Sequence, residues 1–296
     1  MAERYESVPD VVERLRKTDY LADTSIAGVV YLADRLEKPV LVEGPAGVGK
    51  TELAKAVAAS TNARLIRLQC YEGLDEAKAL YEWNYKKQLL RIQADREHET
   101  DWATVESDIF AEPFLLTRPL LEAIRAKDPV VLLIDEVDRV ELETEALLLE
   151  VLSDFQVSIP ELGTITGTQR PLVFLTSNNT RELSEALKRR CLYLHVDYPD
   201  LQREKDIVRV RVPEIDEELA DQVARVVRSI RQLDLKKSPS ISETIDWAQT
   251  LMYLGIDEVT PEAIGETLHV LLKYQPDILK ARKELQVPSE PVAAGS

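Results

Sequence analysis

The sequence predicts an α/β fold, in which a parallel five-stranded sheet with helices on both faces is followed by a smaller all-helical domain. Five short apolar runs alternate with helical segments up to Val196, a pattern typical of parallel sheets. A glycine-rich turn joins the first run directly to a helix, and after Pro199 only helical periodicity remains. We therefore assign residues 1–200 to an α/β domain, 201–286 to a helical domain and 287–296 to a disordered tail.

The N-terminal third combines helices with a charged, aromatic stretch. Residues 1–38 are expected to form helices, with an apolar stripe made of Val29, Leu32, Ala33 and Leu36. Arg64–Gln69 is the second predicted strand. The stretch Cys70–Thr117 is rich in charge and contains Tyr71, Tyr81, Trp83, Tyr85 and Trp102. We interpret it as an amphipathic helical region with half-buried aromatic side chains; partner contacts through these aromatics are the alternative.

The glycine-rich turn is a complete phosphate-loop motif. Val40–Val42 predicts a buried strand, and a helix follows with Leu53, Ala54, Val57 and Ala58 on one face. Between them, the pattern G-x-x-x-x-G-K-[ST] is matched without a gap by Gly44, Pro45, Ala46, Gly47, Val48, Gly49, Lys50 and Thr51. Strand, loop and helix are the context that this motif needs, so a chance match is the weaker explanation.

The residue types of the motif suit the binding of a nucleoside triphosphate. Glycines allow the loop to curl so that its N–H groups point at phosphate oxygens. The positive dipole end of the following helix adds to this attraction. We expect Lys50 to reach the β- and γ-phosphates and the Thr51 hydroxyl to ligate Mg²⁺.

A second apolar run, Pro129–Glu136, ends in two carboxylates. Val130–Ile134 is apolar throughout, as expected of a central parallel strand covered on both faces. The acids then lie at the carboxyl end of the strand, where open α/β sheets place their ligands. We expect Asp135 to hold Mg²⁺, directly or through water, and Glu136 to orient and polarise the attacking water; a solvated strand end is the alternative.

The remaining part of the α/β domain predicts a helix, a hairpin and two strands. A helix at Glu141–Phe155 has Leu148, Val151, Leu152 and Phe155 on its apolar face. A β-hairpin spans 155–167, with Pro160 and Gly163 near its turn. The strand 171–178 ends at Asn178, which either reaches the γ-phosphate or lytic water or is simply a polar turn residue.

A helix at 181–190 leads to the last predicted strand, Leu192–Val196. The helix ends in Lys188, Arg189 and Arg190, which suit the negative end of its dipole. An arginine that points into the nucleotide of a neighbouring subunit is the alternative role. Beyond this strand, Leu219, Val223, Val226, Val227 and Ile230 form one helical stripe. Two further helix starts are marked by a capping box at Ser240–Glu243 and by Thr260-Pro261 before Ile264, Leu268, Leu271 and Leu272.

Composition restricts the class of function. The 296 residues carry a formal net charge of −16 and a sequence pI of about 4.8. Such a surface repels nucleic acid and anionic membranes unless it carries a local basic patch. The sequence has no long Lys/Arg cluster, so we do not expect DNA or RNA as a partner, although solubility alone also explains the acidity. No apolar run approaches the ~20 residues needed to span a bilayer, and the charged start has no signal core. We predict a cytoplasmic protein.

Cysteine and histidine usage predicts no zinc site. Cys70 and Cys191 are isolated, which suits a reducing compartment and forms no metal-binding spacing. His98, His195 and His269 are scattered, and none has a carboxylate, a thiol or a second histidine at ligand spacing. Zinc bound by the protein is therefore not expected.

The ordered set of motifs resembles that of the AAA+ ATPases over roughly residues 20–285. Gly44–Thr51 is similar to Walker A, Asp135-Glu136 to Walker B and Asn178 to sensor 1. Arg190 is similar in position to the arginine finger, with Arg189 as the neighbouring candidate. The hairpin sequence SIPELGTI resembles the pre-sensor hairpin of the MoxR branch. TSNNTRELSEALKRRC and PSISETIDWA resemble its CoxD-like subgroup.

This resemblance implies an ATP hydrolase that uses Mg²⁺ and assembles into a ring, usually a hexamer, with ATP at subunit interfaces. MoxR relatives act as chaperones that assemble or activate complexes and metal cofactors, commonly with a partner that bears a von Willebrand factor A domain. The CoxD-like subgroup implies a client such as a molybdenum hydroxylase of the carbon monoxide dehydrogenase kind. Many relatives have a sensor 2 arginine where this chain has Ser242-Glu243-Thr244, so no sensor 2 residue is transferred.

Four functions remain under consideration. The first is an ATP-driven remodelling or maturation chaperone for a client enzyme. The second is a nucleotide-gated assembly or docking module with weak hydrolysis, favoured by the missing sensor 2 arginine. The third, a nucleic-acid motor with the same core, is disfavoured by the net charge of −16. A metabolic kinase with a phosphate loop is the remaining alternative.

Overall fold

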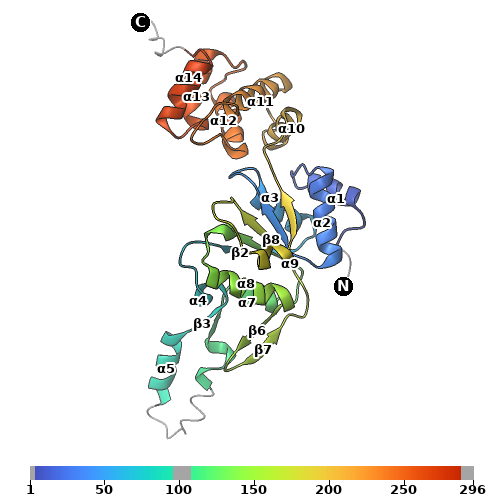
Figure 1. Cartoon of the computed structure of the whole chain (residues 1–296), viewed down its shortest axis with the longest axis vertical. Helices are drawn as coiled ribbons and strands as arrows, with labels where there is room; N and C mark the ends of the chain where they lie inside the picture. The colour runs from blue at the N-terminus through green and yellow to red at the C-terminus, as the bar shows by residue number, and fades with distance from the viewer. Residues whose placement is uncertain (1–3, 96–107, 288–296) are drawn as a thin grey trace. The chain divides into compact units, whose positions relative to one another are not determined.

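The computed structural model describes residues 4–95 and 108–287. The chain divides into two compact units, which we describe separately (Figure 1). The first comprises Met1–Thr18, Ala22–Glu43 and Lys50–His195, and the second comprises Asp19–Leu21, Gly44–Gly49 and Val196–Ser296. Residues 288–296 of the predicted tail 287–296, together with His98 and Trp102, lie outside the described residues.

The first unit contains a five-stranded parallel sheet, which confirms the predicted fold class. The strand order is β2-β5-β8-β1-β9, and every neighbouring pair is parallel. The strands are β1 (Val40–Glu43), β2 (Arg64–Gln69), β5 (Val130–Asp135), β8 (Leu172–Ser177) and β9 (Leu192–His195). Every residue of β1, β5 and β8 is buried, as expected of strands covered on both faces.

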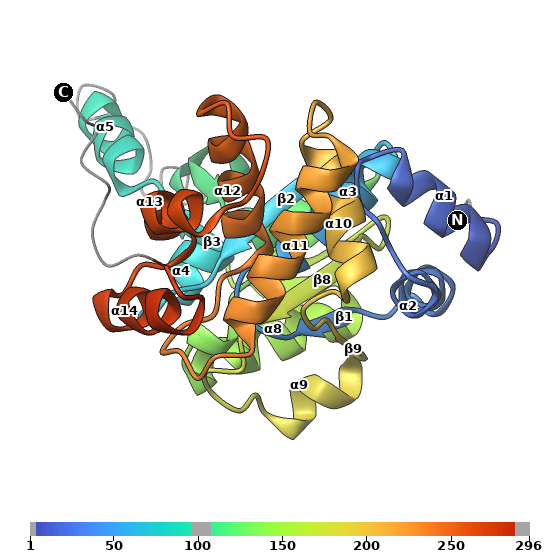
Figure 2. The same ribbon diagram turned by 90° about the horizontal axis from the view of Figure 1, so that it is seen from above.

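Helices flank this sheet (Figure 2). Helix α3 packs against β2, β5 and β8, helix α2 against β1 and β9, and helix α7 against β2. The helices and helical turns of the first unit are α1 (Val8–Arg16), α2 (Thr24–Leu36), α3 (Lys50–Ser60), α4 (Glu76–Ala79), α5 (Tyr85–Asp95), η1 (Glu112–Phe114), α7 (Pro119–Arg125), η2 (Val137–Arg139), α8 (Leu142–Asp154) and α9 (Glu185–Arg190). The predicted apolar face of α8 is buried.

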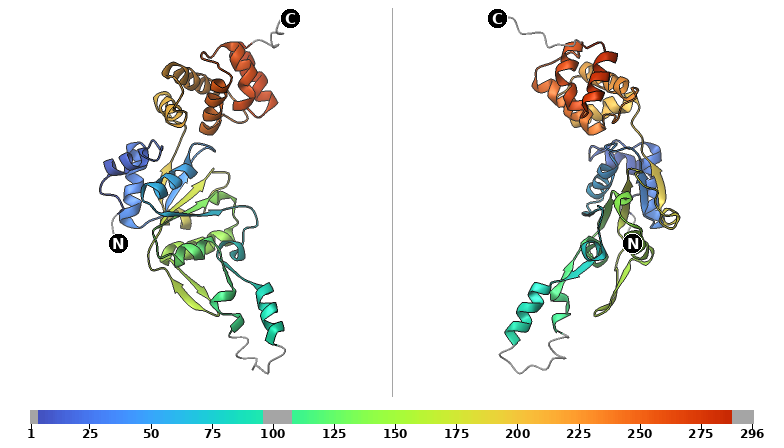
Figure 3. Two further views of the ribbon diagram at one scale, coloured as in Figure 1. Left: turned by 180° about the vertical axis from the view of Figure 1, so that it is seen from behind. Right: turned by 60° about the vertical axis from the view of Figure 1, so that its left-hand side comes forward.

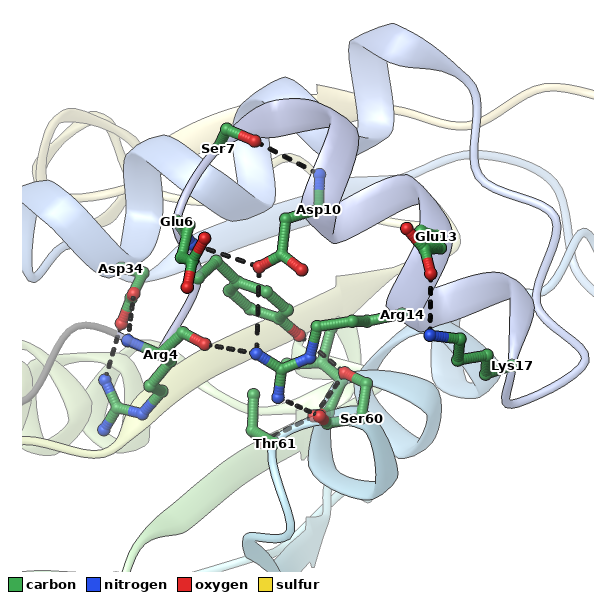
Figure 4. Close-up of polar contacts among 12 residues, drawn as sticks. Arg4, Glu6, Ser7, Asp10, Glu13, Arg14, Lys17, Asp34, Ser60 and Thr61 are labelled. Carbon is green, nitrogen blue, oxygen red and sulfur yellow. Dashed lines mark hydrogen bonds and ion pairs between the residues drawn. The ribbon is translucent and has the colours of Figure 1, made fainter.

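Polar contacts connect the N-terminal helix α1 and the residues before it with the C-terminal end of α3 (Figure 4). The Arg14 guanidinium donates to the carbonyl oxygens of Arg4 and Ser60, the last residue of α3. The hydroxyl groups of Tyr5 and Ser60 lie 2.6 Å apart, and Tyr5 is fully buried. A cation placed on the terminal carbonyls of a helix also complements the helix dipole, so these contacts stabilise α3.

The predicted apolar stripe of α2 is correct for Ala33, which is buried, and wrong for Leu32 and Leu36, which are exposed. The rest of the buried face consists of Ile26, Ala27 and Val30. The neighbouring Asp34 carboxylate explains this choice of face, because it pairs with Arg4 at 2.8 Å and its side chain is only 3% exposed. Nearly every turn of this helix carries an apolar residue, so periodicity alone could not choose between the two faces.

The stretch 70–117 is not the wholly helical region that we predicted. Its described part contains an antiparallel pair of strands, β3 (Tyr81–Trp83) and β4 (Leu115–Thr117), which carries α5 away from the sheet (Figure 3). Trp83 is buried and contacts Phe110 edge to face at 5.3 Å. Tyr85 on α5 is largely exposed.

The predicted hairpin is confirmed. Strands β6 (Gln156–Ile159) and β7 (Gly163–Thr166) pair antiparallel, with Ile159 opposite Gly163. The helix that follows Asn178 begins later than predicted, at Glu185 rather than 181. Two contacts fix this start: the Ser184 hydroxyl caps α9, and the backbone N–H of Ser184 donates to the buried Glu145 carboxylate of α8 at 3.0 Å.

The described part of the second unit beyond Val196 contains helices only. They are α10 (Leu201–Arg211), α11 (Glu217–Arg231), α12 (Ile241–Tyr253), α13 (Pro261–Leu271) and α14 (Gln275–Glu284). Both predicted helix starts are confirmed, since Ser240 and Glu243 form a capping box and Thr260 caps α13. The core includes Trp247, whose indole N–H donates to Thr267 at 2.8 Å. None of the helices described is long and apolar enough to cross a bilayer.

Candidate nucleotide-binding site

The phosphate loop has the backbone geometry for which its glycines were predicted. Gly47 and Gly49 have φ angles of +76° and +96°, which residues with a side chain rarely adopt. At Gly44, a Cβ atom would meet the carbonyl oxygen of Val196 at 1.9 Å, so a side chain does not fit. The loop leads directly into α3, whose first residues are Lys50 and Thr51.

The structure brings Thr51 and Asp135 together at the carboxyl edge of the sheet. The Thr51 hydroxyl donates to Oδ1 of Asp135 at 2.9 Å. The same oxygen accepts a hydrogen bond of 2.5 Å from Thr176, at the end of the neighbouring strand β8. The second oxygen, Oδ2, pairs with the guanidinium of Arg67 on β2. Asp135 therefore lies at the meeting point of three strands and α3, with 3% of its surface exposed.

Lys50 connects the phosphate loop with the predicted sensor residue. Its Nζ donates to the side-chain carbonyl oxygen of Asn178 at 2.8 Å. Burial lowers the pKa of Lys50 below its usual value, although the nearby carboxylates of Asp138, Asp135 and Glu136 oppose this shift. Lys50 is thus largely removed from water and lies near these carboxylates at the carboxyl edge of the sheet, where phosphates are expected to bind.

Glu136 begins a tight turn immediately after β5. Its φ of +58° lies in the left-handed region, an unfavourable conformation for a residue with a side chain. The Thr176 hydroxyl accepts a hydrogen bond from the Glu136 backbone N–H at 2.9 Å and so holds this turn. The Glu136 carboxylate pairs with Arg139 at 3.1 Å and is partly exposed, which leaves it accessible to water.

Asp138 is a residue of this site that the sequence reasoning missed. Its Oδ2 accepts three hydrogen bonds, from the backbone N–H groups of Asn178 and Thr180 and from the Thr180 hydroxyl. Burial alone would raise its pKa, but the bonds from Thr180 and Asn178 outweigh burial and lower the pKa below its ordinary value. The available signal was a third carboxylate in the run Asp135-Glu136-Val137-Asp138.

Arg190 lies in a different neighbourhood from the other predicted site residues. It is the last residue of α9 and is exposed. Its guanidinium donates to the Ser153 hydroxyl of α8 at 2.7 Å and to the carbonyl of Ala186 at 3.2 Å. The adjacent Arg189 is exposed as well. Within the described chain, the hydrogen bonds of Arg190 go to Ser153 and Ala186 and do not connect it with Lys50 or Asp135.

The donor set fits a bound Mg²⁺ ion. Thr51 and Asp135 offer a hydroxyl and a carboxylate, hard oxygen ligands of the kind that Mg²⁺ prefers. Mg²⁺ in nucleotide sites usually keeps only one or two protein ligands and completes its shell with phosphate and water. In the described residues, no group of three or more His, Cys, Asp or Glu side chains is placed to hold a metal.

Comparison with known proteins defines the class of this site. The family model described as ATPase family associated with various cellular activities (AAA) matches residues 40–196. The match spans more than half of the chain, which therefore belongs to the AAA family of ATPases. Membership implies nucleotide binding, typically with Mg²⁺, and ATP hydrolysis.

Individual relatives are distant. An uncharacterised protein of Staphylococcus haemolyticus is 23% identical over 265 residues, which cover 85% of this chain and 93% of the relative. The gas vesicle ATPase GvpN of Haloferax mediterranei is 27% identical over 207 residues, or 66% of this chain and 57% of GvpN. Among solved structures, a mutant of Thermotoga maritima RuvB matches with a TM-score of 0.50 at 17% identity and covers 97% of this chain and 75% of its own. This last similarity shows the fold alone.

Proposed function

We propose that the chain is a Mg²⁺-dependent ATP hydrolase of MoxR type that works as a remodelling or maturation chaperone. The observation that carries the proposal is the convergence of Lys50, Thr51, Asp135 and Asn178 at one edge of the sheet. Similarity to the gas vesicle ATPase supports an ATPase role. The MoxR assignment, and within it the CoxD-like subgroup, rests on the hairpin and the sequence motifs that follow it.

Each residue has a distinct task in this proposal. The loop Gly44–Gly49 wraps the phosphates, and Lys50 neutralises the β- and γ-phosphates. Thr51 and Asp135 hold the metal ion, which neutralises charge that develops on the phosphate oxygens. Glu136 accepts a proton from the attacking water, and Asn178 orients that water or the γ-phosphate.

Arg190 completes the site of a neighbouring subunit in this proposal. An exposed arginine at the end of a helix, separate from the site of its own chain, can reach a nucleotide across an interface. Such a finger stabilises charge in the transition state of phosphoryl transfer. The proposed assembly is a ring of identical chains, hexameric by resemblance, with Arg189 as the alternative finger. The proposed partners are a von Willebrand factor A domain protein and a client enzyme, with a molybdenum hydroxylase as one candidate.

A nucleotide-gated docking module with weak hydrolysis is the second candidate. The first turn of α12 contains Ser242, Glu243 and Thr244, with no arginine to contact a γ-phosphate. Glu243 is already committed to its capping box, in which it accepts a hydrogen bond of 2.7 Å from the Ser240 backbone. In this case ATP would promote assembly without rapid turnover.

The substitution Glu136→Gln tests the hydrolase proposal. The variant should bind ATP like the wild type and lose about 10²–10⁴-fold in turnover, because only proton transfer from water is removed. Turnover and binding of a fluorescent ATP analogue are measured on the same preparation. Glu141→Gln, which neutralises an exposed carboxylate at the start of α8, is the matched control and should turn over normally.

Two outcomes would contradict the proposal. Normal turnover in the Glu136→Gln variant would show that Glu136 is not the base. A wild-type chain that changes its assembly state with ATP but shows no turnover would favour the docking module.

In the ring, Arg190→Ala should abolish the rise of turnover per subunit with protein concentration while ATP binding persists.

A further inference from the structure

An arginine on β2 is bonded to the carboxylate that is proposed to hold the metal. Gln69 lies opposite Asp135 in the register of β2 and β5. Arg67, two residues earlier, projects from the same side of β2 because side chains alternate along a strand. Its guanidinium reaches Oδ2 of Asp135 at 2.5 Å and also donates to the side-chain oxygen of Gln69.

The three contacts of Asp135 differ in character. Oδ1 accepts from the hydroxyl groups of Thr51 and Thr176, which are neutral donors. Oδ2 accepts from Arg67, and this is the ion pair that the described structure gives to Asp135. The Asp135 side chain is 4% exposed, and a carboxylate withdrawn from water to this extent requires a countercharge.

Arg67 itself is poised to move. Its side chain is 48% exposed, so its guanidinium can be hydrated when it leaves Asp135. The buried carboxylate that it leaves then needs another cation in its place. Asp135, by contrast, is fixed from the other side by two hydroxyl groups. A cation arriving beside Thr51 and Asp135 would therefore repel a mobile guanidinium and leave the carboxylate in place.

We propose that Arg67 is the resident counter-cation of the metal-site carboxylate: it neutralises Asp135 when no metal is bound and competes with Mg²⁺ for that carboxylate. Arg67 is thus a positioning residue, which acts through Asp135. The inference rests on the proposed ATPase function and refines its metal site. It also assigns a role to an arginine that lies outside the phosphate loop and the Asp135-Glu136 motif.

The proposal predicts opposite effects of Arg67→Gln on two binding measurements. Without metal, in EDTA, a fluorescent ATP analogue should bind about tenfold more weakly, because a positive charge near the phosphates is lost. The free Mg²⁺ concentration that half-maximally enhances binding of the analogue should fall by about tenfold, because a competing cation is gone. If Arg67 had a purely structural role, Arg67→Gln would weaken binding of the analogue in EDTA and would raise, rather than lower, the Mg²⁺ concentration required.

Arg64 provides the matched control. It lies on the same strand and pairs with Glu122, and both side chains are about half exposed. Arg64→Gln removes the same formal charge and should leave both binding measurements near those of the wild type. Arg67→Lys keeps the positive charge and should retain most of the wild-type Mg²⁺ requirement, which provides a test even where the glutamine variant folds poorly.

The outcomes separate this inference from the proposed function. A wild-type chain that binds no ATP analogue with or without Mg²⁺ would overturn the proposed function. A wild-type chain that binds the analogue, together with an Arg67→Gln variant that matches Arg64→Gln in both measurements, would overturn only the role of Arg67. An increased Mg²⁺ requirement in Arg67→Gln, or a requirement in Arg67→Lys that falls as far as in Arg67→Gln, would overturn it as well.

Discussion

Replacing Asp138 by asparagine should loosen the segment that carries Asn178, the proposed sensor residue. One carboxylate oxygen of Asp138 accepts hydrogen bonds of 3.2 Å and 2.9 Å from the N–H groups of Asn178 and Thr180 and one of 2.6 Å from the Thr180 hydroxyl. These bonds fix the backbone that places Asn178 on Lys50. Because Asp138 is only 3% exposed, water cannot easily compensate for hydrogen bonds that the substitution weakens.

The magnitude follows from the charge on the acceptor. A hydrogen bond to a charged group contributes about 1.5–3 kcal/mol, against about 1 kcal/mol for a neutral one. Asparagine keeps one acceptor oxygen, so the loss is mainly the charge assistance. It also places an N–H₂ group where the buried Oδ1 of Asp138 has no hydrogen-bond partner in the described structure. We expect Asp138→Asn to lower the free energy of unfolding by about 2 kcal/mol.

Urea unfolding at pH 7 and ATP turnover are the assays. Turnover should fall together with stability, since Asn178 loses its fixed position while the phosphate loop is unchanged. Asp154→Asn, at an exposed position at the end of α8, is the control of the same chemical change. An Asp138→Asn variant with the stability and turnover of this control would refute the reasoning.

The pH dependence supplies an independent check. Hydrogen bonds from Thr180 and Asn178, acting against burial, lower the pKa of folded Asp138 below its ordinary value of 3.8. A lowered pKa means that the ionised form stabilises the fold above about pH 4 and that this contribution is lost as the pH falls through the folded pKa. The stability difference between wild type and Asp138→Asn should therefore shrink in acid. A difference that grows as the pH falls would contradict the cause assigned to the shift.

Two further predictions concern the first unit. Arg14→Ala should lower the thermal midpoint and cost about 1–3 kcal/mol, because the carbonyl oxygens of Ser60 and Arg4 lose a charged donor. Arg16→Ala, at an exposed position on the same helix, is the control, and equal midpoints would contradict the role of Arg14. Burial raises the pKa of both Cys70 and Cys191 to about 12 from a usual 9.0. At pH 8.5 iodoacetamide should alkylate the native chain far more slowly than the guanidinium-unfolded chain, and equal rates measured by intact mass would refute this. Since the unfolded thiols ionise first, their contribution to stability declines as the pH rises above about 9.

The parts of the site that were predictable are those encoded by consecutive residues. Gly44–Thr51 and Asp135-Glu136 each lie at the carboxyl end of a strand and contain the residue types that the chemistry needs. Because the residues of each motif are consecutive, they lie close together in any fold that forms the strand. The parallel sheet then brings Thr51 within hydrogen-bond distance of Asp135. Arg67 could not be found in this way, because its role depends on the register of β2 against β5.

Prediction failed where several local patterns were equally acceptable. The apolar residues of α2 surround the helix, and an ion pair between Asp34 and Arg4 selects the buried face. The late start of α9 depends on Glu145, a residue of another helix. In the stretch 70–117, the short strands β3 and β4 are held by each other, and strands of this length carry little periodicity of their own.

The segment between Asn178 and Arg190 is anchored to α8 and its preceding turn at three points. Asp138 accepts hydrogen bonds from the first residues of the segment, Glu145 from its middle, and Ser153 from the guanidinium of Arg190. Two of these anchors are buried carboxylates, whose bonds are costly to break without replacement. Bending the segment away from α8 would therefore break at least one of these bonds. In the proposed ring, they would connect Asn178, in the site of one subunit, with Arg190, the finger offered to the next. A double-mutant cycle between Asp138→Asn and Arg190→Ala in ATP turnover should then show an interaction between the two positions, and additive effects would contradict this connection.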